Sequence, residues 1–147
     1  MPELPEVEVS RQGLLPLLRG QRILGAVVRT PRLRHEIPPD LASQLTGLRL
    51  DGILRRGKYL LLDCESSARG GWIILHLGMS GSLRLVPPET PPRKHDHVDL
   101  VFCHSVLRLR DPRRFGAVLW HAGGDVESHP LLAALGVEPL SEGFSGD

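Results

Sequence analysis

The chain has 147 residues, of which 41% are hydrophobic and 24% are charged, and it contains two cysteines. This size suits one globular domain with a core that needs neither disulfides nor a structural metal. No apolar run approaches the roughly 18 residues of a membrane span, and the acidic, proline-rich start is no secretory signal. We therefore expect a cytoplasmic protein without membrane contact, with Cys64 and Cys103 as buried, reduced thiols.

The formal net charge of +1 conceals an uneven distribution. All 18 Lys and Arg lie at or before Arg114, against 12 Asp and Glu in the same stretch, which leaves +6. Residues 115–147 carry five acids and no Lys or Arg, which leaves −5. A basic body with an acidic tail is typical of a polyanion-binding surface, although a basic run can also be a solvated face.

The first predicted element is a helix from Pro5 to about Leu18. Pro5 suits a first turn, two acidic residues follow it, and apolar side chains then recur at helical spacing. Gly13 and Pro16 weaken the pattern and predict a bend or an early end.

After Gly20 the pattern changes to short apolar runs separated by Gly, Pro or charged clusters, which is typical of an antiparallel sandwich. Two further short helices are expected, over Pro39–Leu45 and His129–Gly136. Eight strands are expected: Ile23–Arg29, Leu48–Leu54, Tyr59–Cys64, Trp72–Leu77, Ser82–Val86, Val98–Cys103, Val106–Arg110 and Ala117–Trp120.

The predicted fold class is therefore mainly β (α+β). It is a two-sheet antiparallel β-sandwich flanked by an N-terminal helix and a short second helix. The domain is expected to span residues 1–135, and the polar residues 136–147 are expected to form a linker. On composition alone, the same ending also fits a complete small domain with a frayed terminus.

Pro2 is the most reactive candidate. If Met1 is removed, Pro2 becomes a free secondary amine, and terminal α-amino groups have pKa values of about 7.7–8.0 against roughly 10.4 for lysine. Such an amine is partly unprotonated near neutral pH and can attack a sugar C1′ or an aldehyde. The adjacent Glu3 is a candidate general acid. The alternative is an ordinary Met-Pro start whose glutamates only complement a helix dipole.

Five motifs resemble, in order and spacing, those of the formamidopyrimidine-DNA glycosylases. They are MPELPEVE at 1–8, RRGKYL at 55–60, HLGMSGSL at 76–83, KHDHVD at 94–99 and DPRRFG at 111–116. Leu4 favours the branch of the family that acts on purine lesions over the related endonuclease VIII group. The resemblance extends from Met1 to about Gly143 and covers the first half of the family's usual length.

The resemblance implies a bacterial base-excision repair enzyme that removes oxidised purines such as 8-oxoguanine from duplex DNA and has apurinic/apyrimidinic lyase activity. Pro2 would attack C1′ and form a Schiff base, Glu3 would protonate the sugar ring oxygen, and Lys58 would contact the lesion or a flanking phosphate and assist strand cleavage. The implied partner is double-stranded DNA with an oxidised purine or an abasic site, bound by a monomer at the bacterial nucleoid.

Four further residues are implied DNA contacts. Met79, Arg113 and Phe115 would fill the space left by the flipped nucleotide, which offsets part of the few kcal/mol that unstacking costs. His95 would contact a phosphate. From residue type alone, Lys58 could instead extend to solvent from a strand end, while Met79 and Phe115 could fill the core.

No metal site is predicted in this chain. His95 and His97 alternate and are expected to share a strand face, but no cysteine or third ligand lies nearby. Asp96 and Asp99 are expected to orient arginine or backbone groups. Zinc is expected only in the family's C-terminal half, a helix-two-turn-helix region with a four-cysteine zinc ribbon, which these 147 residues do not contain.

Without that half, the 147 residues alone are expected to be weakly active or inactive. A retained Met1 would abolish Schiff-base chemistry, because it turns the Pro2 nitrogen into an amide. Two alternatives belong to other classes. One is a non-catalytic DNA-binding module, and the other is an N-terminal-proline tautomerase with Pro2 as general base, which would need neither the Met79 and Phe115 loops nor the basic body.

Overall fold

The computed structural model describes residues 4–78, 81–123, 126 and 129–133. Within them lie the helices α1 (Leu4–Leu18), α2 (Leu41–Leu45) and α3 (Pro130–Ala133). The strands are β1 (Gly25–Val28), β2 (Arg49–Arg56), β3 (Tyr59–Glu65), β4 (Gly70–His76), β5 (Ser82–Val86), β6 (Asp96–Val101), β7 (Val106–Arg110) and β8 (Ala117–Ala122). The expected linker at 136–147 and the domain boundary before it lie outside the described residues and stay predictions.

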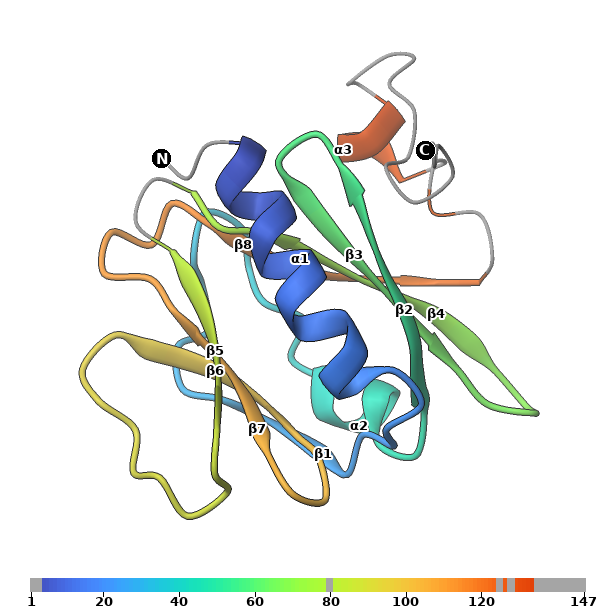
Figure 1. The fold of residues 1–147 in the computed structure, drawn as a ribbon. Helices are drawn as coiled ribbons and strands as arrows, with labels where there is room; N and C mark the ends of the chain where they lie inside the picture. Colours follow the sequence, from blue (N-terminus) through green and yellow to red (C-terminus); the bar gives the residue numbers. More distant parts are fainter. Residues whose placement is uncertain (1–3, 79–80, 124–125, 127–128, 134–147) are drawn as a thin grey trace.

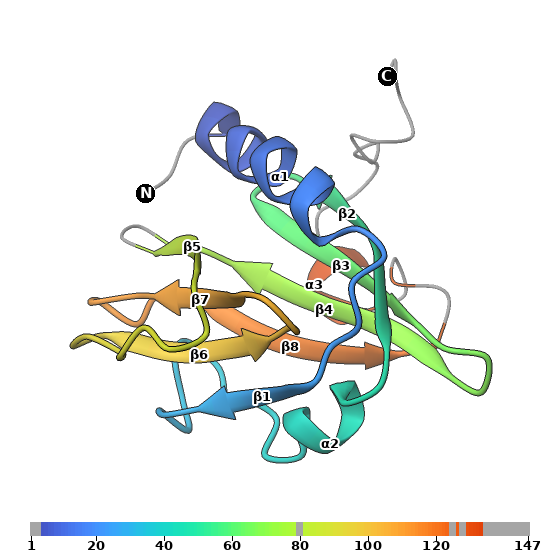
Figure 2. The same cartoon turned by 60° about the horizontal axis from the view of Figure 1, so that its bottom comes forward.

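The strands form two four-stranded sheets that face each other (Figures 1 and 2). Sheet A has the order β2-β3-β4-β8 and sheet B the order β1-β6-β7-β5, and every pairing is antiparallel. The two-sheet antiparallel sandwich is therefore confirmed. Each of the eight expected strands is present, with ends that differ by at most two residues from the predicted ones.

Helix α1 closes one side of the sandwich and packs on β2 and β3 (Figures 1 and 2). Its apolar face joins the main core through Val7, Leu14 and Leu18. The helix expected from Pro5 to about Leu18 is confirmed, and Pro16 does not end it early. Proline there removes one hydrogen bond of the last turn, while the burial of Leu14 and Leu18 holds that turn on the core. Among the described helices, none has the length and apolar character needed to cross a membrane.

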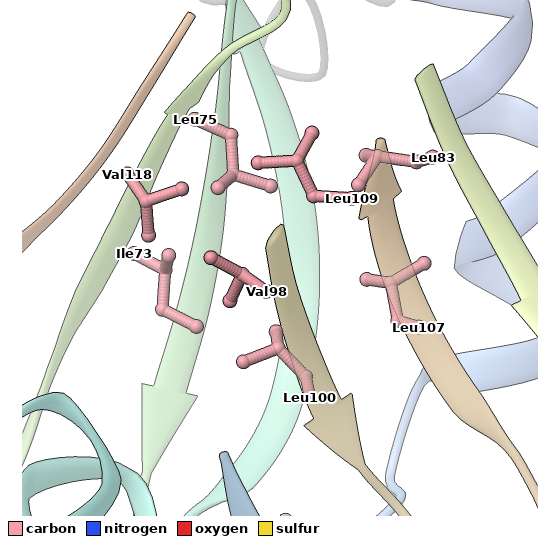
Figure 3. A pocket seen from close by; sticks show the side chains of 8 residues that line it. All are labelled: Ile73, Leu75, Leu83, Val98, Leu100, Leu107, Leu109 and Val118. Atoms are coloured by element: carbon pink, nitrogen blue, oxygen red, sulfur yellow. The ribbon is translucent and has the colours of Figure 1, made fainter. Parts of the chain in front are cut away.

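The core between the sheets is apolar and closely packed. Ile73, Leu75 and Val118 of sheet A face five side chains of sheet B, namely Leu83, Val98, Leu100, Leu107 and Leu109 (Figure 3). The gap between them is about 10 Å³, about the space of a single water molecule. With no polar lining, it is a packing gap rather than a ligand site.

A smaller apolar cluster covers the outer face of sheet A. Leu61 and Ile74 of that face are buried against Val126 and Leu132, so that the segment around α3 lies over the middle of the sheet.

The two cysteines differ in environment. Cys64 is buried, and burial raises the pKa of its thiol. The prediction of a second buried thiol is wrong, because Cys103 lies exposed in the tight turn between β6 and β7.

The packing of the sheets predicts the effect of a single truncation. Leu107 is 2% exposed and points into the gap between the sheets, so Leu107→Ala should lower the free energy of unfolding by about 2–5 kcal/mol. Urea denaturation measures the change. Val27→Ala is the control, since Val27 is 42% exposed on the edge strand β1 and should change stability by less than about 0.5 kcal/mol. Equal effects of the two variants would contradict the assigned core.

Candidate functional site

Antiparallel pairing brings three loops to one end of sheet A. Tyr59 at the start of β3 pairs with His76 at the end of β4, and His76 pairs with Ala117 at the start of β8. The loops that join β2 to β3, β4 to β5 and β7 to β8 therefore leave the sheet beside one another (Figure 1). We call this group of loops the loop end.

Glycines let two of these loops touch. A Cβ on Gly78 would lie 2.8 Å from the Gly116 nitrogen, closer than real Cβ contacts, and Gly78 also has a positive φ of 68°. A Cβ on Gly116 would collide with the His76 carbonyl oxygen. The β4–β5 and β7–β8 loops can therefore pack together only because both positions lack a side chain.

The β2–β3 loop presents Lys58. It is a two-residue hairpin loop closed by the Arg56–Tyr59 pair, and Gly57 takes a φ of 62° at its first position. Glycine at that position suits a type II′ turn, whose twist matches the flanking strands. Lys58 is partly buried at the tip, and its charge contributes to a lowered pKa at His76. The lysine thus lies close to the end of β4.

The start of α1 is tied to the same loop. Glu8 accepts an ion-paired hydrogen bond of 3.0 Å from Arg55, and Arg55 also donates to the Gly57 carbonyl at 3.1 Å. Arg11 forms a second ion pair with Glu8 at 2.6 Å. The hydrogen bond from Arg11, supported by those from Gln12 and Arg55 and opposed by partial burial, lowers the pKa of Glu8 to about 2. Glu8 is therefore charged near neutral pH and fixes the first turns of α1 over the Lys58 loop.

A cavity of about 390 Å³ opens beside these loops. Its lining consists of Arg34, His35, Tyr59, His76 and Ala117. Nδ1 of His76 accepts the Gly78 N–H at 3.1 Å, so the neutral ring carries its proton on Nε2. Burial first, and then the charges of Arg34 and Lys58, lower the pKa of His76. An electropositive cavity with an N–H donor is suited to an anionic oxygen.

The β7–β8 loop exposes a large apolar side chain. Phe115 is 41% exposed, and the guanidinium carbon of the exposed Arg113 lies 4.9 Å from the centre of its ring. This distance is in the range of a cation–π contact. Phe115 is therefore not a core residue, which excludes that alternative.

His95 lies next to this loop, just before β6. It is partly buried, has a positive φ of 73°, and accepts the Asp111 N–H on its carbonyl at 3.0 Å. Partial desolvation, followed by the charges of Lys94 and Arg110, lowers the pKa of its ring. His95 lies outside β6, which begins at Asp96 and shifts register between Asp96 and Val98, so the two histidines do not share a regular strand face. Their rings are nevertheless neighbours, with centroids 6.2 Å apart in an edge-to-face arrangement.

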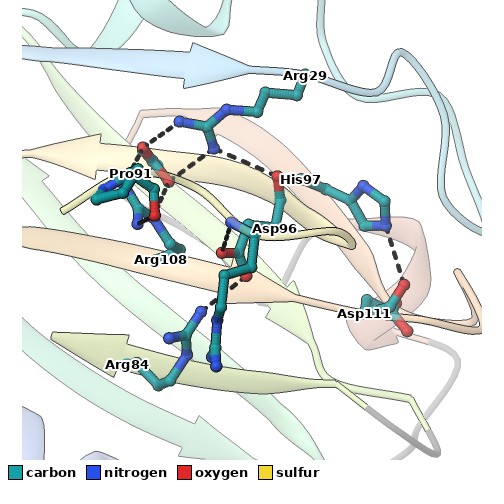
Figure 4. Close-up of polar contacts among 9 residues, drawn as sticks. Arg29, Arg84, Pro91, Asp96, His97, Arg108 and Asp111 are labelled. Atoms are coloured by element: carbon teal, nitrogen blue, oxygen red, sulfur yellow. Dashed lines mark hydrogen bonds and ion pairs between the residues drawn. The ribbon is translucent and has the colours of Figure 1, made fainter. Parts of the chain in front are cut away.

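His97 and the acids of β6 have structural partners (Figure 4). His97 is buried, with Nδ1 2.8 Å from Thr30 Oγ1 and Nε2 3.0 Å from the Asp111 carbonyl. Within the described residues, no group of three potential ligands could hold a metal.

The two aspartates orient arginine and backbone groups, as predicted. Asp99 binds Arg29 and Arg108, each through two hydrogen bonds. Asp96 accepts from Arg84 at 2.7 Å and from the Arg93 N–H at 2.7 Å. Despite burial, these hydrogen bonds keep the pKa of both carboxyl groups below the ordinary value.

Comparison with known proteins gives the family. Residues 1–118 match the family model described as the formamidopyrimidine-DNA glycosylase N-terminal domain, which is more than half of the chain. The chain belongs to the formamidopyrimidine-DNA glycosylase family. The sequence resemblance is thereby confirmed.

Curated relatives agree over the whole chain. The formamidopyrimidine-DNA glycosylase of Dechloromonas aromatica is 60% identical over 149 residues, which cover 100% of this chain and 54% of that protein. That of Aromatoleum aromaticum is 60% identical over 146 residues and covers 99% and 52%. The chain thus spans about half the length of the curated relatives it matches.

Solved structures of the family share the fold. Lactococcus lactis Fpg in complex with DNA containing N7-benzyl-Fapy-dG has a TM-score of 0.81 and 33% identity, covering 94% of this chain and 49% of that one. The same enzyme with abasic-site DNA has a TM-score of 0.76 and 32% identity, covering 90% and 47%.

The structure places part of the predicted glycosylase site. The candidates that lie at or beside the loop end are Lys58, His95, Arg113 and Phe115. The candidates outside the described residues are Pro2, Glu3 and Met79. The catalytic and DNA-binding roles of all seven stay predictions.

Sequence reasoning missed Arg34 and His76 as candidate site residues. The sequence contains a pattern that could have indicated His76, since this histidine lies at the end of an apolar strand, just before a glycine-containing turn. No such pattern indicates Arg34, because it comes from the irregular segment between β1 and α2. Its backbone N–H donates to the Gly116 carbonyl at 3.0 Å, which holds this segment beside the β7–β8 loop.

The ion pairs of Glu8 predict a pH dependence. The folded pKa of about 2 lies below the ordinary 4.5, so the stabilisation is present above the ordinary pKa and is lost as the pH falls through the folded one. Glu8→Gln should therefore cost about 1–2 kcal/mol at neutral pH, and this difference should shrink from about pH 5 down to about pH 2. Urea denaturation across this range measures it, with the exposed Glu89→Gln as control. A difference that is constant with pH would contradict the ionic role.

Proposed function

We propose that this chain forms the catalytic part of a bacterial DNA glycosylase that excises oxidised purines from duplex DNA and also acts as an apurinic/apyrimidinic lyase. The observation that carries the proposal is the loop end. It gathers a lysine, an exposed phenylalanine in contact with an arginine, and a cavity lined by Arg34 and two histidines, beside the start of α1. The DNA complexes of Lactococcus lactis Fpg with benzylated Fapy-dG and with an abasic site support the same substrate class.

The chemistry begins with the amine of Pro2 once Met1 has been removed. The nitrogen attacks C1′, the glycosidic bond breaks, and its electron pair leaves with the damaged base. Glu3 protonates the sugar ring oxygen as the ring opens, which yields an iminium between Pro2 and C1′. Loss of a C2′ proton then expels the 3′ phosphate, and Lys58 assists this elimination. These roles rest on the family resemblance, and the tie between Glu8, Arg55 and the Lys58 loop supports them.

The surroundings of this chemistry suit a DNA backbone. His76 and Arg34 line one cavity, where the Nε2–H of His76 and the guanidinium of Arg34 can bind a phosphate oxygen of the lesion strand. Arg113 and Phe115 protrude from the adjoining loop and can replace the extruded nucleotide in the stack.

Borohydride trapping tests the nucleophile. Chain with a free Pro2 amine should form at least a trace of stable adduct on abasic-site duplex, and peptide mass mapping should place the sugar on residue 2. Chain with Met1 retained should give no adduct at residue 2, because an amide nitrogen has no basic lone pair. Equal trapping by both forms would move the nucleophile elsewhere, with Lys58 as the first candidate. No adduct from the processed form would favour a non-catalytic DNA-binding module.

A second experiment tests the exposed ring. In the full-length protein that contains this chain, Phe115→Ala should slow single-turnover excision from duplex DNA by about 5- to 150-fold, the range that corresponds to stacking on one base. Cleavage at an already unstacked abasic site should slow much less. Leu17→Ala is the control, since it removes an exposed apolar side chain near the other end of α1. A loss of the same size on both substrates would contradict insertion.

A further inference from the structure

Asp111 has a completely buried carboxylate that accepts hydrogen bonds from the backbone of its own loop. Oδ1 accepts the Arg114 N–H at 3.0 Å and Oδ2 accepts the Gly116 N–H at 2.8 Å, while the side chain is 0% exposed. Each oxygen therefore holds a different point of the β7–β8 loop. The side chains of Arg113, Arg114 and Phe115 in this loop are all exposed.

The main chain of Asp111 links this loop to two histidines. Its N–H donates to the His95 carbonyl at 3.0 Å. Its carbonyl lies 3.0 Å from Nε2 of His97 (Figure 4). Because a carbonyl oxygen only accepts, Nε2 carries the proton, and Nδ1 is left to interact with Thr30 Oγ1 at 2.8 Å. Asp111 thus connects the Arg113–Phe115 loop to His95 directly. Through His97, it also connects this loop to Thr30, which follows β1.

The backbone beside these contacts is unusual. His95 and Arg114 are the non-glycine residues with a positive φ in the described part of the chain, at 73° and 59°. Left-handed backbone at such residues persists only where the surroundings enforce it. Both residues are hydrogen-bonded to Asp111, one through its carbonyl and the other through its N–H.

We propose that Asp111 is a positioning residue that presets the Arg113–Phe115 loop for insertion into duplex DNA and fixes it relative to His95. A loop that is already ordered loses less conformational entropy on binding, so more of the stacking energy remains to offset unstacking. The inference rests on the proposed function. Asp111 acts through Phe115 and does not itself contact the DNA.

Asp111→Asn tests the proposal with little change in shape. An asparagine oxygen can accept one of the two N–H groups, but its amide nitrogen is a donor and cannot accept the other. Asp51→Asn is the matched control. It removes the same charge, and Asp51 lies near the start of β2, away from the Lys58 loop, in an ion pair with Arg49. A general electrostatic effect on DNA binding would appear in both variants.

The readout separates binding from insertion. A duplex carries an abasic site and, opposite it, a fluorescent adenine analogue whose emission rises on unstacking. All variants are made in the full-length protein that contains this chain, where the wild type and Asp51→Asn should bind and raise the emission at saturation. Asp111→Asn should bind with an affinity within about twofold of Asp51→Asn, because phosphate contacts dominate, yet lose most of the emission rise. In a Phe115→Ala background, Asp111→Asn should cause no further loss, since coupled residues are not additive.

Three outcomes overturn specific claims. If Asp111→Asn raises the emission as much as the wild type, the positioning role is wrong and the proposed function stands. If its loss is undiminished in the Phe115→Ala background, Asp111 does not act through the ring. If the full-length wild-type protein gives neither binding nor an emission rise, the proposed function fails, and the inference with it.

If Asp111→Asn does not fold, amide hydrogen exchange of the wild-type protein tests the proposal instead. The amides of Arg114 and Gly116 donate to the buried carboxylate, so they should exchange as slowly as paired amides of β7. Exchange at the rate of exposed loop amides would show that the loop is not preset, and would overturn the proposal without any variant.

Discussion

The in-register pairing of β3, β4 and β8 is the constraint on which the site depends. Side chains alternate between the faces of a strand, so a slip of one residue would exchange the two faces. Leu60, Leu75 and Val118 are buried on the inner face. Their neighbours Tyr59 and His76 then fall on the outer face, at the end where the loops leave. The apolar alternation that builds the core therefore also places Tyr59 and His76 at the site.

Charge is arranged differently in the two sheets. On sheet B, Asp96 and Asp99 accept hydrogen bonds from arginines and from a backbone N–H. Together with the bond from Arg108 to the Pro91 carbonyl, these contacts hold the long segment between β5 and β6 on the sheet. At the loop end, burial and then the cations Arg34 and Lys58 lower the pKa of His76, and desolvation and neighbouring cations act in the same direction on His95 beside it. A neutral histidine in a cationic setting can still donate one hydrogen bond to an anion, while the surrounding charges supply long-range attraction. The net charge of the sequence shows neither arrangement.

Regular elements and local turns were predictable from the sequence, and contacts across the chain were not. Alternating apolar runs with Gly and Pro between them were sufficient for eight strands, because burial and period are local properties. The prediction that Cys103 is buried was wrong because this residue lies at the tip of a hairpin, where a side chain is exposed whatever its hydrophobicity. The role of Asp111 was also out of reach. Gly116 lies in the same loop, but His95 and His97 reach Asp111 only after β6 has paired with β7.

The same hydrogen bonds explain how the loop end can be exposed and ordered together. Full burial of a phenylalanine contributes about 1.5–3 kcal/mol, and Phe115, at 41% exposure, gains only part of it. Left-handed backbone at His95 and Arg114 costs a further 1–3 kcal/mol or so at each residue. Polar contacts must offset this strain, and the carboxylate of Asp111 supplies two charge-assisted bonds in a site without water access. Order at this end therefore comes from a buried acid instead of apolar packing, which leaves the ring of Phe115 available to a partner.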